Sequence, residues 1–249
     1  MARVPSSSGT LAPTVMVMDH DESSREDLRQ LLGSVGLRAE LFASPADLLG
    51  FVKPPGPSCL IMEFRLPTTN GLNVQTRMRS INAETPIIFI SGHGDIPTAV
   101  RAMKAGAVDF LSKPLRQQDL LDAVHAALEL DARRQTAVHA QAELERRFEM
   151  LTSREREVMW HVTSGLMNKQ VAGRMGLSEI TVKVHRGNAM RKMKSKSLAE
   201  FVRQAQTLFG EHDVVGRPPA PRGGAGGEPF NLRSSRRMSV GLGHLTSPA

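Results

Sequence analysis

Residues 168–193 have the sequence NKQVAGRMGLSEITVKVHRGNAMRKM, and this stretch decides the fold of the second half of the chain. Apolar residues recur at helical spacing over Asn168–Met175 and again over Glu179–Met193. Between the two runs, Gly176 favours a turn, and Ser178 is a good N-terminal cap for the second helix. A short helix, a glycine-containing turn and a longer helix together predict a helix-turn-helix unit.

The second helix of such a unit lies in the major groove of DNA, and its N-terminal half faces the base edges. The candidate base-contacting residues in that half are Thr181, Lys183, Val184, His185, Arg186 and Asn188, and Ser178 just before the helix is a further DNA-binding candidate. Lys and Arg pair with guanine, whereas Val contacts the methyl group of thymine. Basic residues placed to contact phosphates are Lys169, Arg191, Lys192, Lys194 and Lys196. We expect the apolar residues Val171, Met175, Leu177, Val182 and Met190 to form the core.

The helix-turn-helix lies inside a longer helical segment that runs from Thr152 to Leu208. Thr152 or Ser153 caps a first helix, and Glu155 is placed to complete a capping box with Thr152. Gly165 ends this helix, which contributes Trp160 to the predicted core, and Leu198–Leu208 forms a fourth helix.

The run LTSREREVMWHVTSGLMNKQVAGRMGLSEITVKVHRGNAMRKMKSKS at residues 151–197 resembles the LuxR/GerE-type helix-turn-helix of the FixJ–NarL branch. The resemblance implies that Lys183 and Val184 reach base edges. It also implies that one base contact is absent at Gly187, where some relatives carry Lys. The fourth helix often forms a dimer contact in this family, and the candidates for it are Leu198, Phe201 and Val202. The alternative is that these three residues pack on their own domain.

The first half of the chain alternates short apolar runs with helical patterns. The apolar runs are Val15–Met18, Ala39–Phe42, Cys59–Met62, Ile87–Ile90 and Val108–Leu111. They lack polar alternation, as expected of strands covered on both faces. Helices are predicted between and after them, including Gly71–Ser80, Ile96–Ala105 and Gln117–Leu130. The pattern predicts a doubly wound α/β fold with a five-stranded parallel sheet, whose ligand chemistry lies beyond the carboxyl ends of the strands.

This half resembles the flavodoxin-like receiver domain of two-component response regulators, most specifically in SGHGDIPTAVRAMKAGAVDFLSKP at residues 91–114. The resemblance implies a switch hydroxyl at Ser91, an aromatic switch residue at Phe110 and a phosphate-binding lysine at Lys113. His93 belongs to a loop common in the FixJ branch and needs no catalytic role. Two positions depart from the pattern: His20 follows Asp19 where a second acid is usual, and Glu63 replaces the usual phosphoacceptor Asp.

These two replacements change what the pocket can do. Mg²⁺ prefers hard oxygen ligands in octahedral geometry, so His20 suits it poorly and Asp19 is left as a weak candidate ligand. Glu63 is one methylene longer than Asp, and we expect its carboxylate to reach Lys113 and Ser91 directly. We therefore hypothesise a receiver that works without aspartyl phosphorylation and is biased toward an active-like state. The alternative is that Glu63 and His20 fill space in an inert dimerisation domain.

The distribution of charge along the chain also indicates two domains that bind different kinds of partner. The formal net charge is +7, but residues 14–130 carry 11 Lys and Arg against 14 Asp and Glu, whereas residues 149–210 carry 11 against 5. A basic second half is typical of a nucleic-acid-binding domain. The one cysteine, Cys59, cannot form an internal disulfide, and no apolar stretch is long enough to span a membrane. We expect a cytoplasmic protein without a membrane partner.

The predicted organisation is a disordered tail (1–13), a receiver-like domain (14–130), a helical linker (131–148), a helix-turn-helix domain (149–210) and a second disordered tail (211–249). Along and just beyond the linker, a thin stripe formed by Val138, Gln141, Leu144, Phe148 and Leu151 is a candidate dimer seam. The segment Arg233–Ser239 is either a phosphate-contacting arm or part of a solvated tail.

The combined features predict a sequence-specific transcription regulator of the two-component type. Its expected partners are double-stranded DNA, a sensor histidine kinase, RNA polymerase and a second copy of the chain. Conventional activation by phosphorylation is one alternative, and an interaction protein that sequesters a kinase or regulator is another. A transition-metal site formed by Asp19, His20, Asp21 and Glu63 is a weaker alternative, because adjacent loop residues rarely converge. We find no nucleophile–base pair or phosphate-binding loop, so we do not expect an enzyme.

Overall fold

A computed structural model describes residues 12–80, 84–92 and 96–209. The chain divides into two compact units, with the boundary after Val138, inside the predicted linker. Four of the predicted features lie outside the described residues: the first eleven residues, His93, the tail 211–249 and its segment Arg233–Ser239. No helix in the described part of the chain is long and apolar enough to cross a membrane.

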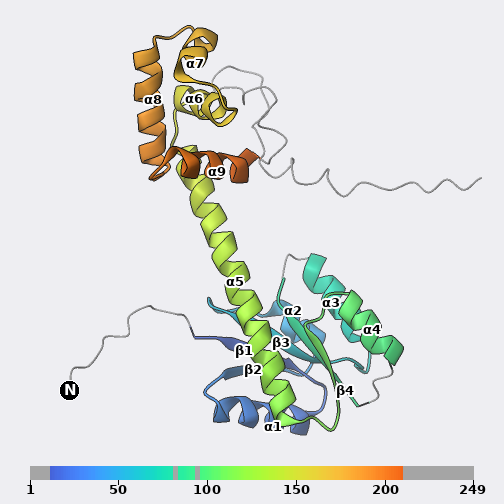
Figure 1. Cartoon of the computed structure of the whole chain (residues 1–249). Helices are drawn as coiled ribbons and strands as arrows, with labels where there is room; N and C mark the ends of the chain where they lie inside the picture. Colours follow the sequence, from blue (N-terminus) through green and yellow to red (C-terminus); the bar gives the residue numbers. More distant parts are fainter. Residues whose placement is uncertain (1–11, 81–83, 93–95, 210–249) are drawn as a thin grey trace, which may run out of the picture. The chain divides into compact units, whose positions relative to one another are not determined.

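The first unit is a parallel sheet with helices on both faces (Figure 1). Its elements are β1 (Thr14–Met18), α1 (Glu22–Ser34), β2 (Arg38–Phe42), α2 (Pro45–Gly50), β3 (Ser58–Glu63), α3 (Gly71–Ser80), β4 (Ile87–Ser91), α4 (Ile96–Lys104), β5 (Asp109–Ser112) and the first part of α5 (Gln117–Glu149). The strand order is β2-β1-β3-β4-β5 and every pairing is parallel. This confirms the doubly wound fold predicted from the sequence. The last strand begins at Asp109, one residue later than predicted, and the Val108 amide donates to the Ile87 carbonyl just before it.

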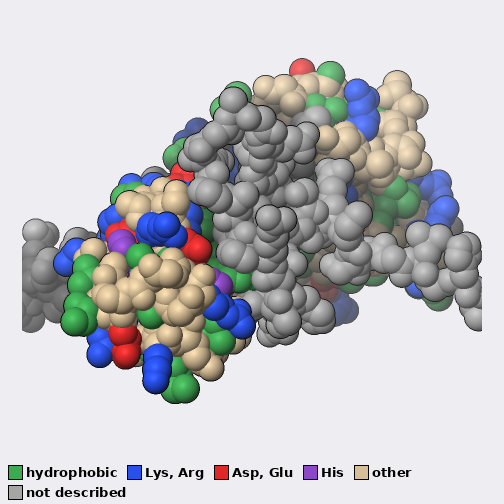
Figure 2. All heavy atoms as spheres, turned by 90° about the horizontal axis from the view of Figure 1, so that it is seen from above, with side chains coloured by type: hydrophobic (Ala, Val, Ile, Leu, Met, Phe, Trp, Pro, Cys, Tyr) green, Lys and Arg blue, Asp and Glu red, His purple; other side chains and the backbone are tan. Residues whose placement is uncertain are grey.

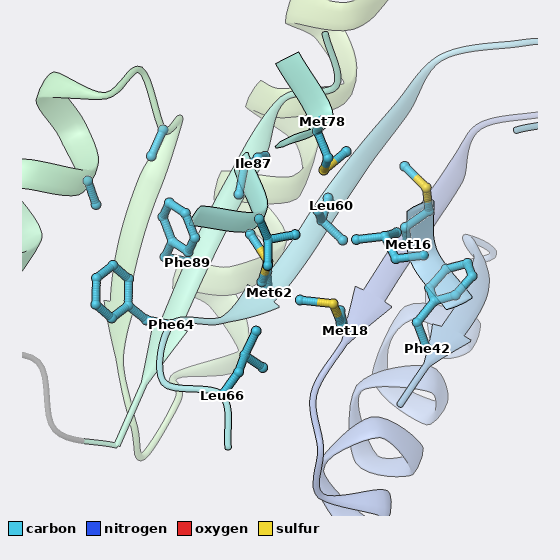
Figure 3. Packing of buried hydrophobic residues seen from close by; sticks show 14 residues of the cluster. Met16, Met18, Phe42, Leu60, Met62, Phe64, Leu66, Met78, Ile87 and Phe89 are labelled. Atoms are coloured by element: carbon cyan, nitrogen blue, oxygen red, sulfur yellow. The ribbon is translucent and has the colours of Figure 1, made fainter. Parts of the chain in front are cut away.

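The sheet has a separate apolar core on each face, because side chains alternate along a strand. Val15 and Val17 of β1 pack with α1 and α5 on one face, through residues such as Leu32 and Val124. On the other face, the buried residues include Met16, Met18, Leu60, Met62, Met78 and Phe89, which Figure 3 shows side by side. Burial on both faces explains why the strands are continuous apolar runs.

Helix α5 continues without a break to Glu149, past the predicted end of the receiver-like domain at residue 130. The fully buried Asp131 holds this continuation against the start of β3. Its Oδ2 accepts hydrogen bonds from the Ser58 amide at 2.8 Å and from Gln135 Nε2 at 2.7 Å, and Arg134 donates to its Oδ1 at 2.9 Å. Gln135 Nε2 also donates to the Gly56 carbonyl at 2.8 Å, so these bonds hold the helix against the segment at the start of β3 as far as Gln135.

The second unit comprises the end of α5 and four further helices: α6 (Ser153–Thr163), α7 (Asn168–Met175), α8 (Glu179–Lys192) and α9 (Leu198–Phe209). Thr152 and Glu155 form the predicted capping box at the start of α6. Gly176, with φ of 64°, ends α7 in the left-handed conformation that favours glycine, and the Ser178 hydroxyl accepts from the Thr181 amide to cap α8.

The core of this unit includes several residues with predicted roles. Val171, Met175, Val182 and Trp160 are buried, while Leu177 and Met190 are partly buried against the core. Phe148 and Leu151 of the predicted dimer seam are also buried in this core, and Leu144 packs against it, whereas Val138 is 61% exposed. Of the three predicted dimer-contact residues, Phe201 is fully buried in its own unit and Leu198 is exposed. The structure thus uses most of the apolar stripe for packing within the unit.

Candidate functional site

The first unit gathers polar side chains at the carboxyl edge of its sheet. Asp19 follows β1, Glu63 ends β3, Ser91 ends β4, and Lys113 follows β5. Asp19, Glu63 and Ser91 are all at least 95% buried. The parallel sheet therefore brings together four of the residues predicted for the receiver pocket.

Lys113 links the two carboxylates of this pocket. Its Nζ lies 2.9 Å from Asp19 Oδ2 and 2.9 Å from Glu63 Oε2, and it also donates to Ser24 Oγ at 3.3 Å. A lysine ammonium has three donors, so each of them has an acceptor here. Burial alone would lower the pKa of Lys113, but the hydrogen bonds and charges of Asp19 and Glu63 outweigh it and raise the pKa.

Asp19 is held from several sides. Its Oδ1 accepts from the Asp21 amide at 3.0 Å and its Oδ2 accepts from Ser24 Oγ at 2.8 Å, in addition to the bond from Lys113. Burial would raise the pKa of this carboxyl, but the bonds from Lys113, the Asp21 amide and Ser24 together lower it. Asp19 is therefore a charged carboxylate whose oxygens already have protein partners.

Glu63 reaches Lys113 directly, as its extra methylene led us to expect. Its other oxygen, Oε1, accepts from the amide of Arg65 at 3.2 Å. Ser91, the predicted switch hydroxyl, is 1% exposed at the neighbouring strand end. Both carboxylate oxygens of Glu63 therefore have partners within the protein.

The donor set of this pocket fits Mg²⁺ poorly. His20, in the position of a usual metal ligand, lies with Nδ1 3.4 Å from Asp19 Oδ1, and half of its side chain is exposed. An imidazole is a poor ligand for this ion, and the Asp19 oxygens are engaged by Lys113, Ser24 and a backbone amide. In the described part of the chain, no three His, Cys, Asp or Glu side chains are grouped to hold a metal ion.

Phe110, the predicted aromatic switch residue, is half-buried on β5. Its ring packs edge-to-face on Phe64, with centroids 5.7 Å apart, and Phe64 packs in the same way on Phe89 at 5.4 Å. Because Phe64 directly follows Glu63, this aromatic chain joins the pocket to the packing of β4 and β5. The residue after Glu63 is thus packed against aromatic side chains of both β4 and β5.

In the second unit, one side of α8 is exposed to solvent. Its exposed residues recur every three or four positions: Glu179, Ile180, Lys183, Val184, Gly187 and Arg191. We call this set the outer face of α8. Val182 and Ala189 lie on the opposite, fully buried side. Of the six predicted base-contacting residues, the structure places Lys183 and Val184 on the outer face.

The other predicted base-contacting residues are less exposed. Arg186 donates to Asn168 Oδ1 on α7 at 3.1 Å. Thr181 Oγ1 lies 2.7 Å from the hydroxyl of the capping residue Ser178. Asn188 accepts from Arg191 at 2.8 Å, and His185, like these three, is partly buried. Sequence reasoning missed Glu179 and Ile180, although the 3.6-residue period of the helix places both beside Lys183.

The residues predicted to contact phosphates divide into two groups. Lys169, Arg191, Lys194 and Lys196 are exposed. Lys192 instead donates from Nζ to Glu155 Oε2 at 2.7 Å, and Glu155 is only 4% exposed. Burial would raise the pKa of Glu155, but Lys192 and Thr152 together lower it. Lys192 therefore has a structural partner that the sequence pattern did not indicate.

On the face that Figure 2 shows, Lys and Arg side chains lie at separate places among acidic and hydrophobic ones. At the end of α8, Lys194 has a φ of 56°, a left-handed conformation that is uncommon for a residue with a side chain. The backbone turns sharply there, and Lys194 and Lys196 remain exposed just beyond the helix.

Comparisons with known proteins identify both units. Residues 15–125 match the family described as the response regulator receiver domain, and residues 149–205 match the bacterial regulatory proteins of the luxR family. Nodulation protein W of Bradyrhizobium diazoefficiens is 52% identical over 78% of this chain and 86% of its own length. The transcriptional regulatory protein FixJ of Azorhizobium caulinodans is 39% identical over 77% of this chain and 90% of its own. The solved structure of the response regulator StyR is 45% identical, with a TM-score of 0.72, and covers 79% of this chain and 99% of its own.

Proposed function

Since this chain belongs to the FixJ-type two-component response regulators, with a receiver domain and a LuxR-type DNA-binding domain, we propose that its receiver controls transcription without being phosphorylated in the usual way. The family makes the chain a DNA-binding transcription regulator with a sensor kinase as the expected partner of the receiver. The pocket of this receiver departs from that scheme at His20 and Glu63.

The observation that carries this proposal is the state of Lys113. In the scheme that the family resemblance implies, this lysine holds an oxygen of the transferred phosphoryl group. Here its three donors face Asp19, Glu63 and Ser24 at 2.9, 2.9 and 3.3 Å. A phosphoryl group on Glu63 would replace that carboxylate as a partner of Lys113, but it would still compete for the lysine with Asp19, which is fully buried. Drawing the cation away from a buried carboxylate is unfavourable.

The residue at the phosphoacceptor position supports the same proposal. Glu63 Oε2 is 2.9 Å from Lys113 and Oε1 accepts from the Arg65 amide, so neither oxygen faces the pocket without a partner. The metal-ligand positions, Asp19 and His20, supply one engaged carboxylate and one imidazole. Transfer of a phosphoryl group to a carboxylate needs a cation that neutralises the negative charge of the phosphoryl oxygens. Asp19 and His20 are poorly suited to hold Mg²⁺ for this purpose.

We propose further that the Glu63–Lys113 pair stands in for part of the contact made by a phosphoryl group. An anionic oxygen bonded to the lysine is the feature that the two arrangements share. Phe110 packs on Phe64, the residue after Glu63, which is consistent with a single conformation of the β4–β5 region. On this proposal the domain is biased toward its active-like state, and signals reach it through a protein partner or ligand rather than through an aspartyl phosphate.

On the DNA side, we propose that the outer face of α8 enters the major groove. Lys183 and Val184 are exposed on it and match the family's base-contacting positions. The exposed Lys169, Arg191, Lys194 and Lys196 are placed to contact phosphates. We also propose that the regulator acts on RNA polymerase at promoters and binds DNA as a homodimer, in which case its operators should contain paired half-sites.

DNA binding by the full chain, with and without acetyl phosphate and Mg²⁺, tests the function. Duplexes selected from a random pool should bind far more tightly than scrambled ones, and acetyl phosphate should leave the affinity of the wild type unchanged. The double variant His20→Asp/Glu63→Asp restores the usual acids and should gain a response to acetyl phosphate. Equal, weak binding to every duplex would contradict the DNA-binding role. A tenfold change in wild-type affinity with acetyl phosphate would contradict the proposal for the receiver.

A further inference from the structure

The N-terminal half of α8 carries two apolar side chains that the protein itself does not bury. Ile180 is 75% exposed and Val184 is 55% exposed. Among the large apolar side chains that the structure describes, only Val52 and Ile96 are more exposed than Ile180. Residues four apart on a helix are neighbours, so Ile180 and Val184 form one apolar surface on the outer face of α8.

Packing within the unit does not account for this surface. The buried residues of α8 are Val182 and Ala189, which belong to the two cores of the unit, and Ile180 and Val184 belong to neither core. A single exposed apolar residue needs no explanation. Ile180 and Val184, however, lie together on the helix face proposed to enter DNA, where they would contact base edges in the major groove.

Gly187 extends the same surface by one turn. A Cβ built at this position has no other atom within 4 Å, so there is open space in front of the helix backbone. Position 187 is one turn beyond Val184 on the outer face. The absence of a side chain there allows the helix to approach a base edge closely on the same side as the two apolar residues.

The polar groups near this surface are few or already paired. Lys183 lies 3.7 Å from the Glu179 carboxylate, and both side chains are about half exposed. Thr181 and Arg186 have partners at the cap and on α7. The start of the outer face therefore offers an apolar surface flanked by one pair of opposite charges.

We propose that Ile180 is a specificity-determining residue, which with Val184 recognises the C5-methyl group of thymine in the major groove. That methyl is the apolar group which base edges present there, whereas cytosine, guanine and adenine present polar atoms. A polar base edge pressed against Ile180 would lose water without gaining a hydrogen bond. The inference rests on the proposed DNA-binding role and adds to it the class of base pair that the first turn of α8 prefers.

Uracil tests the inference, because it differs from thymine only by the methyl group. Duplexes selected by the full chain would be remade with each thymine replaced in turn by uracil. At one or more positions, the dissociation constant of the wild type should rise about fourfold, as expected for one methyl group removed from an apolar contact. The variant Ile180→Ala should be almost insensitive to uracil at one of these positions, and Ile180→Val should keep part of the effect.

Met150→Ala is the matched control, because Met150 is a half-exposed apolar residue of the same unit outside α8. It should keep the full uracil effect. If no uracil replacement weakens wild-type binding, or if Ile180→Ala keeps the whole effect at every position, the inference is wrong while the DNA-binding role stands. If the full chain selects no duplex at all, the proposed function fails and the inference fails with it.

Discussion

Replacing Lys113 with Met should destabilise the first unit strongly, and adding Glu63→Gln should partly reverse the loss. In the wild type, Lys113 compensates the buried carboxylates of Asp19 and Glu63 at 2.9 Å each. Without it, two carboxylates with side-chain exposures of 0% and 6% share a pocket with no lysine. The double variant keeps only one of these charges.

The magnitudes follow from burial. Leaving a buried charge unpaired costs about 3–5 kcal/mol, and because the Lys113 side chain is 30% exposed we expect about 3 kcal/mol, the lower end of that range. Glu63→Gln alone should cost about 1 kcal/mol, because the amide oxygen still accepts from Lys113 and Asp19 keeps its charge. The double variant should lose about 2 kcal/mol rather than the sum of about 4, which is a coupling of about 2 kcal/mol.

Urea titration followed by hydrogen exchange of peptides from β1 and β3 measures the free energy of unfolding of the first unit. The only tryptophan, Trp160, lies in the second unit, so its fluorescence is an internal control that should not change. The deficit of Lys113→Met should shrink as the pH falls below about 4, because Lys113 helps to lower the pKa of Asp19 and this stabilisation is lost as Asp19 takes up a proton. A loss under 1 kcal/mol for Lys113→Met, or additive losses, would refute the ion-pair account.

Three further predictions concern single positions. Gly173→Ala and Gly187→Ala should each stabilise the second unit by up to about 1 kcal/mol, because neither new Cβ meets another atom. Only Gly187→Ala should weaken DNA binding, and equal binding by both variants would contradict a close approach of α8 to the bases. Thr152→Ala should cost about 1 kcal/mol in thermal unfolding by removing the α6 cap, and no change in melting temperature would argue against that role. The first unit should lose stability as the pH falls from about 4 through the lowered pKa of Asp19, and as it rises from about 10 through the raised pKa of Lys113. A flat profile of unfolding free energy in either range would contradict the corresponding shift.

The sheet and its flanking helices could be predicted from the sequence because the signal is local. Runs such as Cys59–Met62 have no polar alternation, and that alone indicates strands buried on both faces. Likewise, Gly176 and Ser178 mark the turn and cap before α8 by their own conformational preferences. The contact between Glu63 and Lys113 could be predicted because the side chain of Glu is one methylene longer than that of the usual Asp.

The roles of individual polar residues could not be predicted in the same way. Arg186 bonds to Asn168 and Lys192 bonds to Glu155, partners 18 and 37 positions away in the sequence. Nothing in the local pattern of α8 distinguishes these side chains from the exposed Lys183. Ile180 was missed for the opposite reason, since an apolar residue in a helix is usually assigned to the core. Whether each of these side chains is exposed, buried or hydrogen-bonded depends on how the helices pack.

Exposure of the purified full chain to acetyl phosphate and Mg²⁺, followed by intact-protein mass spectrometry, tests the account of the receiver pocket most directly. With Lys113 held by Asp19, Glu63 and Ser24, the wild type should show no added phosphoryl group, and His20→Asp/Glu63→Asp should show one. A wild-type chain that gains one phosphoryl group on Glu63 would contradict the account.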